Sequence, residues 1–370
     1  MTRSSHAGET LAPAGNRITD VAGIEVGHAY RIDDDAVVAS PDDGVEGRGW
    51  ATGTTVVRIA SCAATCAVDV RGGGPGTRET DLLDPVNTVQ TAHAIVLSGG
   101  SAYGLAAADG VMAGLEESGS GLAMDTAGHV VPIVPAAVVF DLPVGAWDHR
   151  PDAAFGRDAL SAASVEVAVG SVGAGAGARA GALKGGVGTA SIVIEHGPAA
   201  GVTVGALMVA NPVGAVIDPA TGLPWSVTAA DAAHHGLVAP VSAEIRRYAE
   251  LAAKQSVLNT TIGVVATDAA VDSASLKRVA MAGHDGLARA IVPAHSPLDG
   301  DTIFAVATGD RRIERVAEVP AGMNPDVAVV AEVSRVAAIV VQRAIVNAVI
   351  SARSVAGIPS FVEVLPSALS

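Results

Sequence analysis

The polar triplet Asn259-Thr260-Thr261 is the strongest candidate for a catalytic segment in this chain, because it lies between a helix-like stretch and the apolar run 262–267. A threonine hydroxyl is a weak nucleophile that needs an adjacent base, and an α-amine can fill that role. The reference pKa of an α-amine, about 7.7–8.0, lies near working pH, so no histidine is required. Taken alone, the triplet also fits a helix-to-strand turn, a strand-opening threonine or, in a secreted chain, a glycosylation sequon.

A second pair of candidates, Asp299 and Asp301, comes directly before the apolar run 302–308. Residues two positions apart point to the same face of a strand, so both carboxylates can meet one neighbouring group. The competing interpretation is a solvated Asp-Gly-Asp turn, which is common. A calcium loop would need further oxygen ligands at fixed spacing, and the sequence does not supply them.

The segment 170–188, GSVGAGAGARAGALKGGVG, has glycine at eight of its nineteen positions. Each glycine costs up to about 1 kcal/mol in a helix relative to alanine, so an ordinary helix is not expected here. A GxGxxA spacing that begins at Gly173, with Glu195 as the distant acid, permits a dinucleotide-binding alternative, but that motif needs a helix to begin at this point. A Walker loop would need glycine directly before Lys184, and none is there. We expect a tight wall of backbone near a site.

The spacing of histidine and cysteine does not indicate a metal site. The ten histidines include only one close pair, His234-His235, and adjacent residues usually point to different faces. Cys62 and Cys66 lie too far apart along a strand for an easy disulfide, so we expect buried thiols in a reducing compartment. No metal and no other cofactor is expected.

Seven blocks of sequence resemble, in order, the family of self-processing N-terminal-nucleophile hydrolases that includes the DmpA-type aminopeptidases, the β-aminopeptidases and the nylon-oligomer endohydrolases. The blocks are DVRGGGPGTRETDLLDP (69–85), LSGGSAYGLAAADGV (97–111), RAGALKGGVGTAS (179–191), MVANPVG (208–214), LNTTIGVVATDA (258–269), MAGHDGLARAI (281–291) and LDGDTIFAVATG (298–309). So many ordered blocks make a chance resemblance implausible.

The resemblance implies that the chain cuts itself between Asn259 and Thr260, leaving a larger subunit, 1–259, and a smaller one, 260–370. The hydroxyl of Thr260 would attack the carbonyl of Asn259, and water would hydrolyse the resulting ester. The freed amine and hydroxyl of Thr260 would then act as base and nucleophile on an amide substrate.

The same resemblance assigns roles to four more side chains. Asp299 and Asp301 would hold the amine and hydroxyl of Thr260. The side-chain amide of Asn211 would form the oxyanion hole, a contribution worth about 10²–10³ in rate. Lys184 would stabilise developing negative charge or orient Asp301. The competing interpretations are an Asn-Pro turn for Asn211 and an exposed lysine for Lys184.

One departure from the family pattern bears on specificity. Aminopeptidase members carry a glutamate and a tyrosine, two residues apart, that hold the free amine of the substrate. The aligned positions here are Val138 and Phe140. Their apolar side chains favour hydrophobic amides as substrates, such as linear 6-aminohexanoate (nylon) oligomers that are cut internally, or small peptides. An aminopeptidase, a β-aminopeptidase, a D-amino-acid amidase or esterase, and a threonine-dependent acyltransferase are alternatives. A nucleotide-binding protein without enzymatic activity is a further one.

Strands and helices must position these residues. Short β-type runs lie at 54–60, 94–97, 165–169, 191–195, 202–210, 262–267 and 302–308. Helical patterns lie at 105–117, 241–256, 273–291 and 326–350, and Asp272 or Ser273 can cap the third. With no linker and no repeat, we expect one α/β catalytic domain, 1–370. The resemblance implies a layered αββα sandwich of the N-terminal-nucleophile hydrolase type.

Composition narrows the partners and the compartment. Hydrophobic residues make up 49% of the chain but aromatic residues only 3%, so the core must consist of small aliphatic side chains. The net charge of −15 disfavours nucleic acid and anionic membranes. Residues 1–20 contain no apolar signal segment, and charges interrupt the apolar stretch 327–350, which we expect to be a core helix. We therefore expect a cytoplasmic enzyme acting on a small amide or peptide, assembled as a homo-oligomer of processed heterodimers, as in the family.

Overall fold

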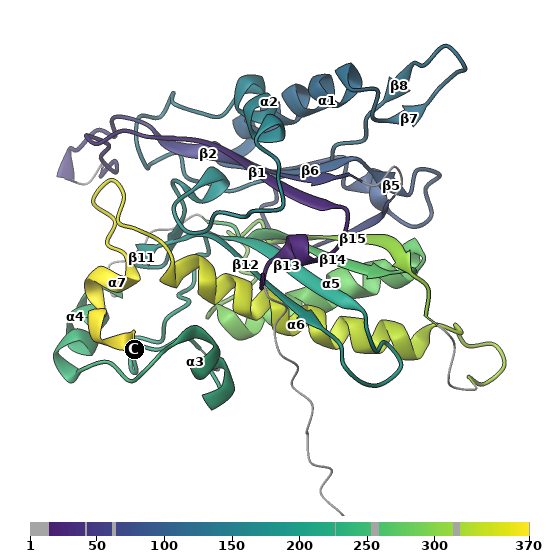
Figure 1. Cartoon of the computed structure of the whole chain (residues 1–370). Coiled ribbons are helices and arrows are strands. Elements are labelled where there is room, and N and C mark those ends of the chain that lie inside the picture. The colour runs from purple at the N-terminus through teal and green to yellow at the C-terminus, as the bar shows by residue number, and fades with distance from the viewer. Residues whose placement is uncertain are drawn as a thin grey trace, which may run out of the picture.

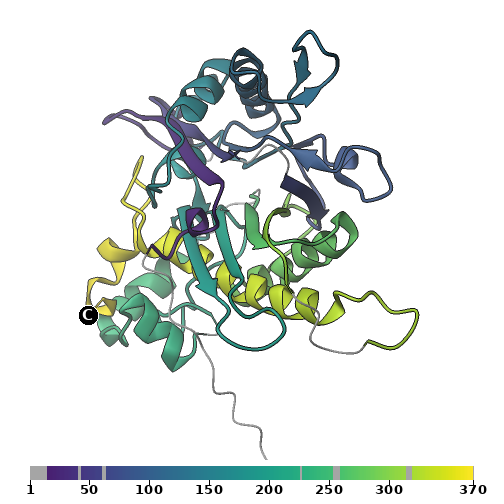
Figure 2. The same ribbon diagram turned by 45° about the vertical axis from the view of Figure 1, so that its right-hand side comes forward.

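The structure, a computed structural model, describes residues 15–40, 43–60, 64–225, 227–252, 259–313 and 319–369. Two β-sheets lie face to face, and helices cover the outer face of each (Figures 1 and 2). The layers therefore follow the order helix, sheet, sheet, helix. This αββα sandwich confirms the predicted fold class.

The first sheet has the strand order β1-β2-β6-β9-β4. Its strands are β1 (Ile24–Ile32), β2 (Ala51–Ile59), β6 (Ala94–Ser98), β9 (Ala136–Val138) and β4 (Thr77–Arg78). Two helices, α1 (Ala107–Glu117) and α2 (Ala153–Ser161), cover its outer face. Side chains alternate along the strands, so that Val56 packs against these helices and Val57 packs toward the other sheet.

The second sheet has the order β12-β13-β14-β15-β3-β5. Its strands are β12 (Gly186–Val193), β13 (Thr203–Ala210), β14 (Ile262–Ala269), β15 (Thr302–Arg311), β3 (Ala64–Val70) and β5 (Thr91–Ala92). Two long helices, α5 (Ser273–Ala290) and α6 (Val327–Ile350), cover its outer face. The pair β14 and β15 is parallel, and α5 lies on the connection between them.

The smaller elements lie at the ends and edges of these layers. They are the hairpin of β7 (Leu122–Ala123) and β8 (Val130–Val131), the pair β10 (Arg179–Ala180) and β11 (Leu183–Lys184), the helices α3 (Ala229–His235), α4 (Ser242–Ala252) and α7 (Phe361–Val364), and the 3-10 helices Ile18–Asp20, Asp81–Leu83, Ser101–Ala106, Gly173–Gly175 and Pro366–Ala368.

Helix α6 is long and apolar enough, by length and composition, to cross a membrane, but 67% of its apolar 18-residue stretch is buried inside the protein. It packs against α5, β12 and β13. The approach to β12 is close, since a Cβ atom at Gly188 would lie 2.1 Å from the carbonyl oxygen of Ala344. The helix is therefore part of the core, as the sequence predicted.

Most of the predicted elements are confirmed, with ends that differ by a few residues. Helix α5 begins at Ser273, and the Asp272 side chain accepts a hydrogen bond from the N–H of Ser275 at 2.7 Å. The predicted helix 241–256 is described from Ser242 to Ala252, and residues 253–258 lie outside the described ranges. Cys66 is buried, and Cys62 lies outside the described ranges.

The predicted strand at 165–169 is wrong. Its residues are largely exposed and form no ladder. Isolated bridges hold the segment at its two ends, from Ser164 to Val26 in the first sheet and from Gly170 to Val187 in the second. The segment thus crosses from the edge of one sheet to the edge of the other, so its alternating sequence finds no partner strand.

Candidate active site

The parallel pairing of β14 and β15 places the two polar motifs side by side. Ile262 pairs with Thr302 in the ladder, and an isolated parallel bridge joins Asn259 to Asp299 in the same register. The triplet 259–261 therefore lies alongside Asp-Gly-Asp 299–301, at the start of two neighbouring strands.

Thr260 is buried and held by backbone groups. Its hydroxyl donates to the carbonyl oxygen of Asn259 at 2.6 Å and accepts the N–H of Gly300 at 3.2 Å. Its own N–H donates to the carbonyl oxygen of Asn211 at 2.6 Å. The hydroxyl is thus fixed beside the peptide bond that precedes it.

Asp301 holds the residue after Thr260. Its Oδ1 accepts the N–H of Thr261 at 2.8 Å. Its Oδ2 accepts the backbone N–H of His295 at 3.2 Å and lies 2.9 Å from Nδ1 of the same residue. Among the described residues, and with the bond before Thr260 intact, the carboxylate has no hydrogen bond to Thr260 itself.

Asp299 braces the surrounding loops. Its Oδ2 accepts the N–H of Ser296 at 3.0 Å and the hydroxyl of Ser296 at 2.6 Å, and its Oδ1 accepts the N–H of Val213 at 3.2 Å. Burial raises the pKa of Asp299, and the nearby carboxylate of Asp301 raises it further. Asp301 therefore holds the residue after Thr260, while Asp299 holds the loops of Ser296 and Val213. Direct contact of either carboxylate with an amine of Thr260 stays a prediction.

Asn211 follows β13 and meets Thr260 through its backbone carbonyl. Its side-chain Oδ1 accepts the N–H of Arg179 at 2.8 Å, and Nδ2 donates to the carbonyl oxygen of Phe140 at 3.2 Å. The side-chain amide is thus bound to two loops, in a residue whose backbone carbonyl accepts the N–H of Thr260. Its role as an oxyanion donor stays a prediction.

Lys184 is fully buried, so the alternative of an exposed lysine is wrong. Its Nζ donates to the carbonyl oxygens of Gly175 at 2.7 Å and Gly185 at 3.0 Å, which closes the glycine-rich wall. Burial lowers the pKa of Lys184 to about 7, while the charge of nearby Asp141 opposes that shift. Burial likewise raises the pKa of Asp141 to about 6.

The glycine-rich segment does not have the form that a dinucleotide motif requires. Only the 3-10 helix Gly173–Gly175 begins there, and short strands follow. Within the described ranges, no three histidine, cysteine, aspartate or glutamate side chains gather so that they could hold a metal ion.

A pocket of about 390 Å³ opens beside Thr260. Val138 and Phe140, the predicted substrate-binding residues, both line it. The other lining residues are Gly74, Pro75, Gly76, Ser101, Ala102, Asn259, Pro297 and Leu298. None of these side chains is acidic, so the pocket wall offers no carboxylate to a substrate's amine.

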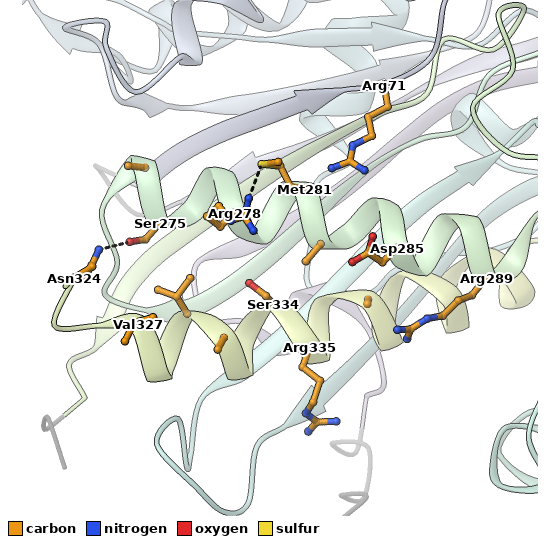
Figure 3. Close-up of a pocket in the computed structure, with 15 residues that line it drawn as sticks. Arg71, Ser275, Arg278, Met281, Asp285, Arg289, Asn324, Val327, Ser334 and Arg335 are labelled. Carbon is orange, nitrogen blue, oxygen red and sulfur yellow. Dashed lines mark hydrogen bonds between the residues drawn. The ribbon is translucent and has the colours of Figure 1, made fainter. Parts of the chain in front are cut away.

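A larger hollow, of about 700 Å³, lies between α5 and α6 on the outside of the second sheet (Figure 3). Arg278 and Met281 from α5 and Ser334 from α6 line it, with Arg71 above (Figure 3). None of the candidate catalytic side chains lines this hollow, so its size does not make it the active site.

The sequence did not indicate two residues that contact the candidate side chains. His295 contacts Asp301 across a spacing of six residues that no helix or strand rule predicts. Arg179 is partly buried beside Asn211, and its Nε has no hydrogen-bond partner among the described residues. The only sequence signal for either is that it stands within or next to a family-like block.

The sequence profile of peptidase family S58 matches residues 16–361. An uncharacterised aminopeptidase of Mycobacterium tuberculosis is 53% identical over 357 residues, which cover 95% of this chain and 99% of that protein. A 6-aminohexanoate-oligomer endohydrolase of Kocuria sp. is 34% identical over 266 residues, 70% of each chain.

Two solved structures share the fold. The L-aminopeptidase D-Ala-esterase/amidase of Ochrobactrum anthropi, described as a variant of the Ntn hydrolase fold, has a TM-score of 0.67 and 22% identity, covering 93% of this chain and 88% of that one. A Burkholderia sp. β-aminopeptidase has a TM-score of 0.66 and 24% identity, covering 96% and 93%. The fold is therefore that of an N-terminal-nucleophile hydrolase. The chain belongs to peptidase family S58 and is an amide-bond hydrolase.

The lowered pKa of Lys184 predicts a pH dependence of stability. That pKa is about 7 in the folded protein against a reference value of 10.5, so the unfolded chain binds more protons between these values. The lysine's contribution to the free energy of unfolding should therefore rise as the pH increases from 7 to 10.5. Urea unfolding of wild type and Lys184→Met at several pH values checks this. A difference between the two proteins that stays constant across the window would contradict it.

Gly300 should be essential because of its position against Thr260. A Cβ atom there would lie 2.8 Å from the carbonyl oxygen of Gly74 and 3.0 Å from Oγ of Thr260. Gly300→Ala should therefore displace the hydroxyl and lower hydrolysis on the order of 100-fold. The matched control is Gly74→Ala, whose methyl would come no closer than 3.8 Å to its neighbours and should cost much less. Equal losses in the two variants would rule out this explanation.

Proposed function

We propose that this hydrolase cuts its own chain between Asn259 and Thr260 and then uses Thr260 as an N-terminal nucleophile. One observation carries the proposal: a buried threonine hydroxyl lies between the carbonyl of Asn259 and the N–H of Gly300, at the edge of a pocket. A threonine that only opened a strand would need neither the pocket nor the paired aspartates.

Self-cleavage follows as an acyl shift. The hydroxyl oxygen of Thr260 attacks the carbonyl carbon of Asn259, the C–N bond breaks, and the hydroxyl proton goes to the departing nitrogen of Thr260. The product is an ester between the Asn259 acyl group and the Thr260 oxygen. Water hydrolyses this ester, which releases the carboxyl group of Asn259 and restores the hydroxyl.

The amine that cleavage releases at Thr260 would lie next to hydrogen-bonding groups from the start. The nitrogen of Thr260 already lies 2.6 Å from the carbonyl oxygen of Asn211, and Asp301 holds the following residue. As the base, this amine takes the hydroxyl proton while the oxygen attacks a substrate carbonyl, and the proton then passes to the leaving amine. Asn211, Lys184, Asp299 and Asp301 are proposed to support this step.

The pocket supports apolar, linear amides as substrates. Val138 and Phe140 supply apolar surface beside the nucleophile, and no acidic side chain lines the pocket. We therefore propose internal cleavage of linear amide oligomers, such as those of 6-aminohexanoate, or of small peptides. The relationship to the Kocuria oligomer endohydrolase is consistent with this class.

An aminopeptidase activity is the second candidate, because the Mycobacterium relative with 53% identity over nearly the whole chain carries that name. Transfer of the acyl group to an amine instead of water is a further alternative, which hydroxamate formation would detect. Assembly as a homo-oligomer and location in the cytoplasm stay predictions.

The first test of this function is maturation. The purified protein should resolve under denaturing conditions into two fragments, the smaller beginning Thr-Thr-Ile-Gly-Val. Thr260→Ala should stay whole and inactive, because one hydroxyl performs both attacks, whereas Thr260→Ser keeps a hydroxyl and should cut and hydrolyse. N-terminal sequencing that begins at Thr261, or a whole chain with full activity, would remove Thr260 from the mechanism.

The second test is the cost of capping the substrate's amine. Acetylated and free 6-aminohexanoate oligomers should differ in kcat/KM by less than about tenfold, because the pocket holds no carboxylate that must be paired. A strict aminopeptidase would lose on the order of 10⁴-fold on capping. If acetylated oligomers are inert while free-amine oligomers or peptides turn over, the aminopeptidase candidate replaces the endohydrolase.

A further inference from the structure

His295 contacts the machinery around Thr260 without lining the substrate pocket. It lies in the loop before β15, with Nδ1 2.9 Å from Oδ2 of Asp301, and its backbone N–H donates to the same oxygen at 3.2 Å. The other carboxylate oxygen accepts the N–H of Thr261 at 2.8 Å. One carboxylate thus links His295 to the residue that directly follows the proposed nucleophile.

The burial of Asp301 makes these contacts necessary. Asp301 is 2% exposed, so its carboxylate depends on protein donors in place of water. Within the described ranges, two of the three N–H groups that reach it belong to His295. In this contact a carboxylate oxygen is the acceptor and Nδ1 the donor, which corresponds to the tautomer with the ring proton on Nδ1.

In the described part of the chain, the hydrogen bond and the ion pair of the His295 ring are both with Asp301. Its Nε2 is buried without a hydrogen-bond partner there. The ring packs edge-on against His284, with the ring centroids 4.9 Å apart. Burial lowers the pKa of His284 to about 4, so this neighbour is neutral near pH 7, and its Nε2 is already bound to the carbonyl oxygen of Asp69. The polar contact of the ring is therefore with Asp301.

The backbone of His295 is adapted to the same contact. Its φ angle is +55°, in the left-handed region that few residues other than glycine adopt and in which histidine, asparagine and aspartate are enriched. In this conformation the backbone N–H and Nδ1 of one residue converge on a single carboxylate oxygen. Strained backbone of this kind persists where the surroundings require it.

We propose that His295 is a positioning residue, which fixes the Asp301 carboxylate and, through the N–H of Thr261, the direction of the Thr260 hydroxyl. This inference rests on Thr260 being the nucleophile, as proposed above. Because His295 does not line the pocket, it acts on the rate of attack and leaves substrate binding nearly unchanged. The same defect must slow self-cleavage, which involves no added substrate.

Three substitutions separate the hydrogen bond from the backbone strain. His295→Asn places an amide N–H where Nδ1 stands and tolerates the left-handed backbone. His295→Asp has the same shape and tolerance but presents a carboxylate to Asp301. His295→Gly relieves the backbone and removes the side-chain donor. Each variant is checked for wild-type circular dichroism, and Thr260→Ala is measured in parallel.

The readouts are the rate of fragment appearance and, for processed protein, kcat and KM on a free-amine 6-aminohexanoate oligomer or a dipeptide amide that the wild type hydrolyses. His295→Asn should keep both rates within about fivefold of wild type. His295→Gly should lose on the order of 10- to 100-fold in both, with KM within about twofold, and His295→Asp should lose at least as much.

Three outcomes would overturn the inference. The first is wild-type rates in His295→Gly, and the second is equal losses in folded His295→Asn and His295→Asp. The third is a loss confined to KM, because it would place His295 in substrate binding. If His295→Asp fails to fold, the comparison of His295→Asn with His295→Gly still tests the positioning role. An active Thr260→Ala would instead reject the proposed nucleophile. If Thr260→Ala is inactive and all three His295 variants keep wild-type rates, only the positioning role is rejected.

Discussion

The parallel pairing of β14 with β15 is the interaction on which the site depends. It brings residues 259–261 against residues 299–301, although forty positions separate them in the chain. A parallel pair needs a crossover connection, and α5 supplies it while covering the outer face of the sheet. A slip of one residue in this register would turn Thr260 to the opposite face and break the contact between Asp301 and Thr261.

Close backbone packing explains how a site with so few large side chains can be well defined. The partners of Thr260 are the carbonyls of Asn211 and Asn259 and the N–H of Gly300, all of them groups that cannot rotate away. The loop that contains Gly72 packs closely against Asp299, because a Cβ atom at Gly72 would lie 2.2 Å from the carbonyl oxygen of Asp299. Fixed dipoles of this kind need little rearrangement during a reaction. The scarcity of aromatic residues is therefore compatible with a precise site.

The resemblance to a known family implied the αββα layers and the residues that meet around Thr260, but not their hydrogen bonds. Helix α5 and the strands around Thr260 follow from apolar periodicity and capping, which are local properties. The burial of Lys184 and the contact of His295 with Asp301 depend on how loops fold over one another, which periodicity does not report. The exposed segment 165–169 shows the converse, because a strand-like sequence forms no strand where the chain crosses from one sheet edge to another and is bridged only at its two ends.

The strand order of the second sheet determines what a cut before Thr260 would do to the molecule. Strands β14 and β15 lie between β13 on one side and β3 on the other, both from the segment before the cut. Each product would therefore lack part of a continuous sheet, and the smaller one would expose two unpaired edges if it were released. The nicked protein should therefore stay interlocked through its own ladder hydrogen bonds. Separating its halves requires unfolding, and making them as two independent polypeptides would require them to fold around each other.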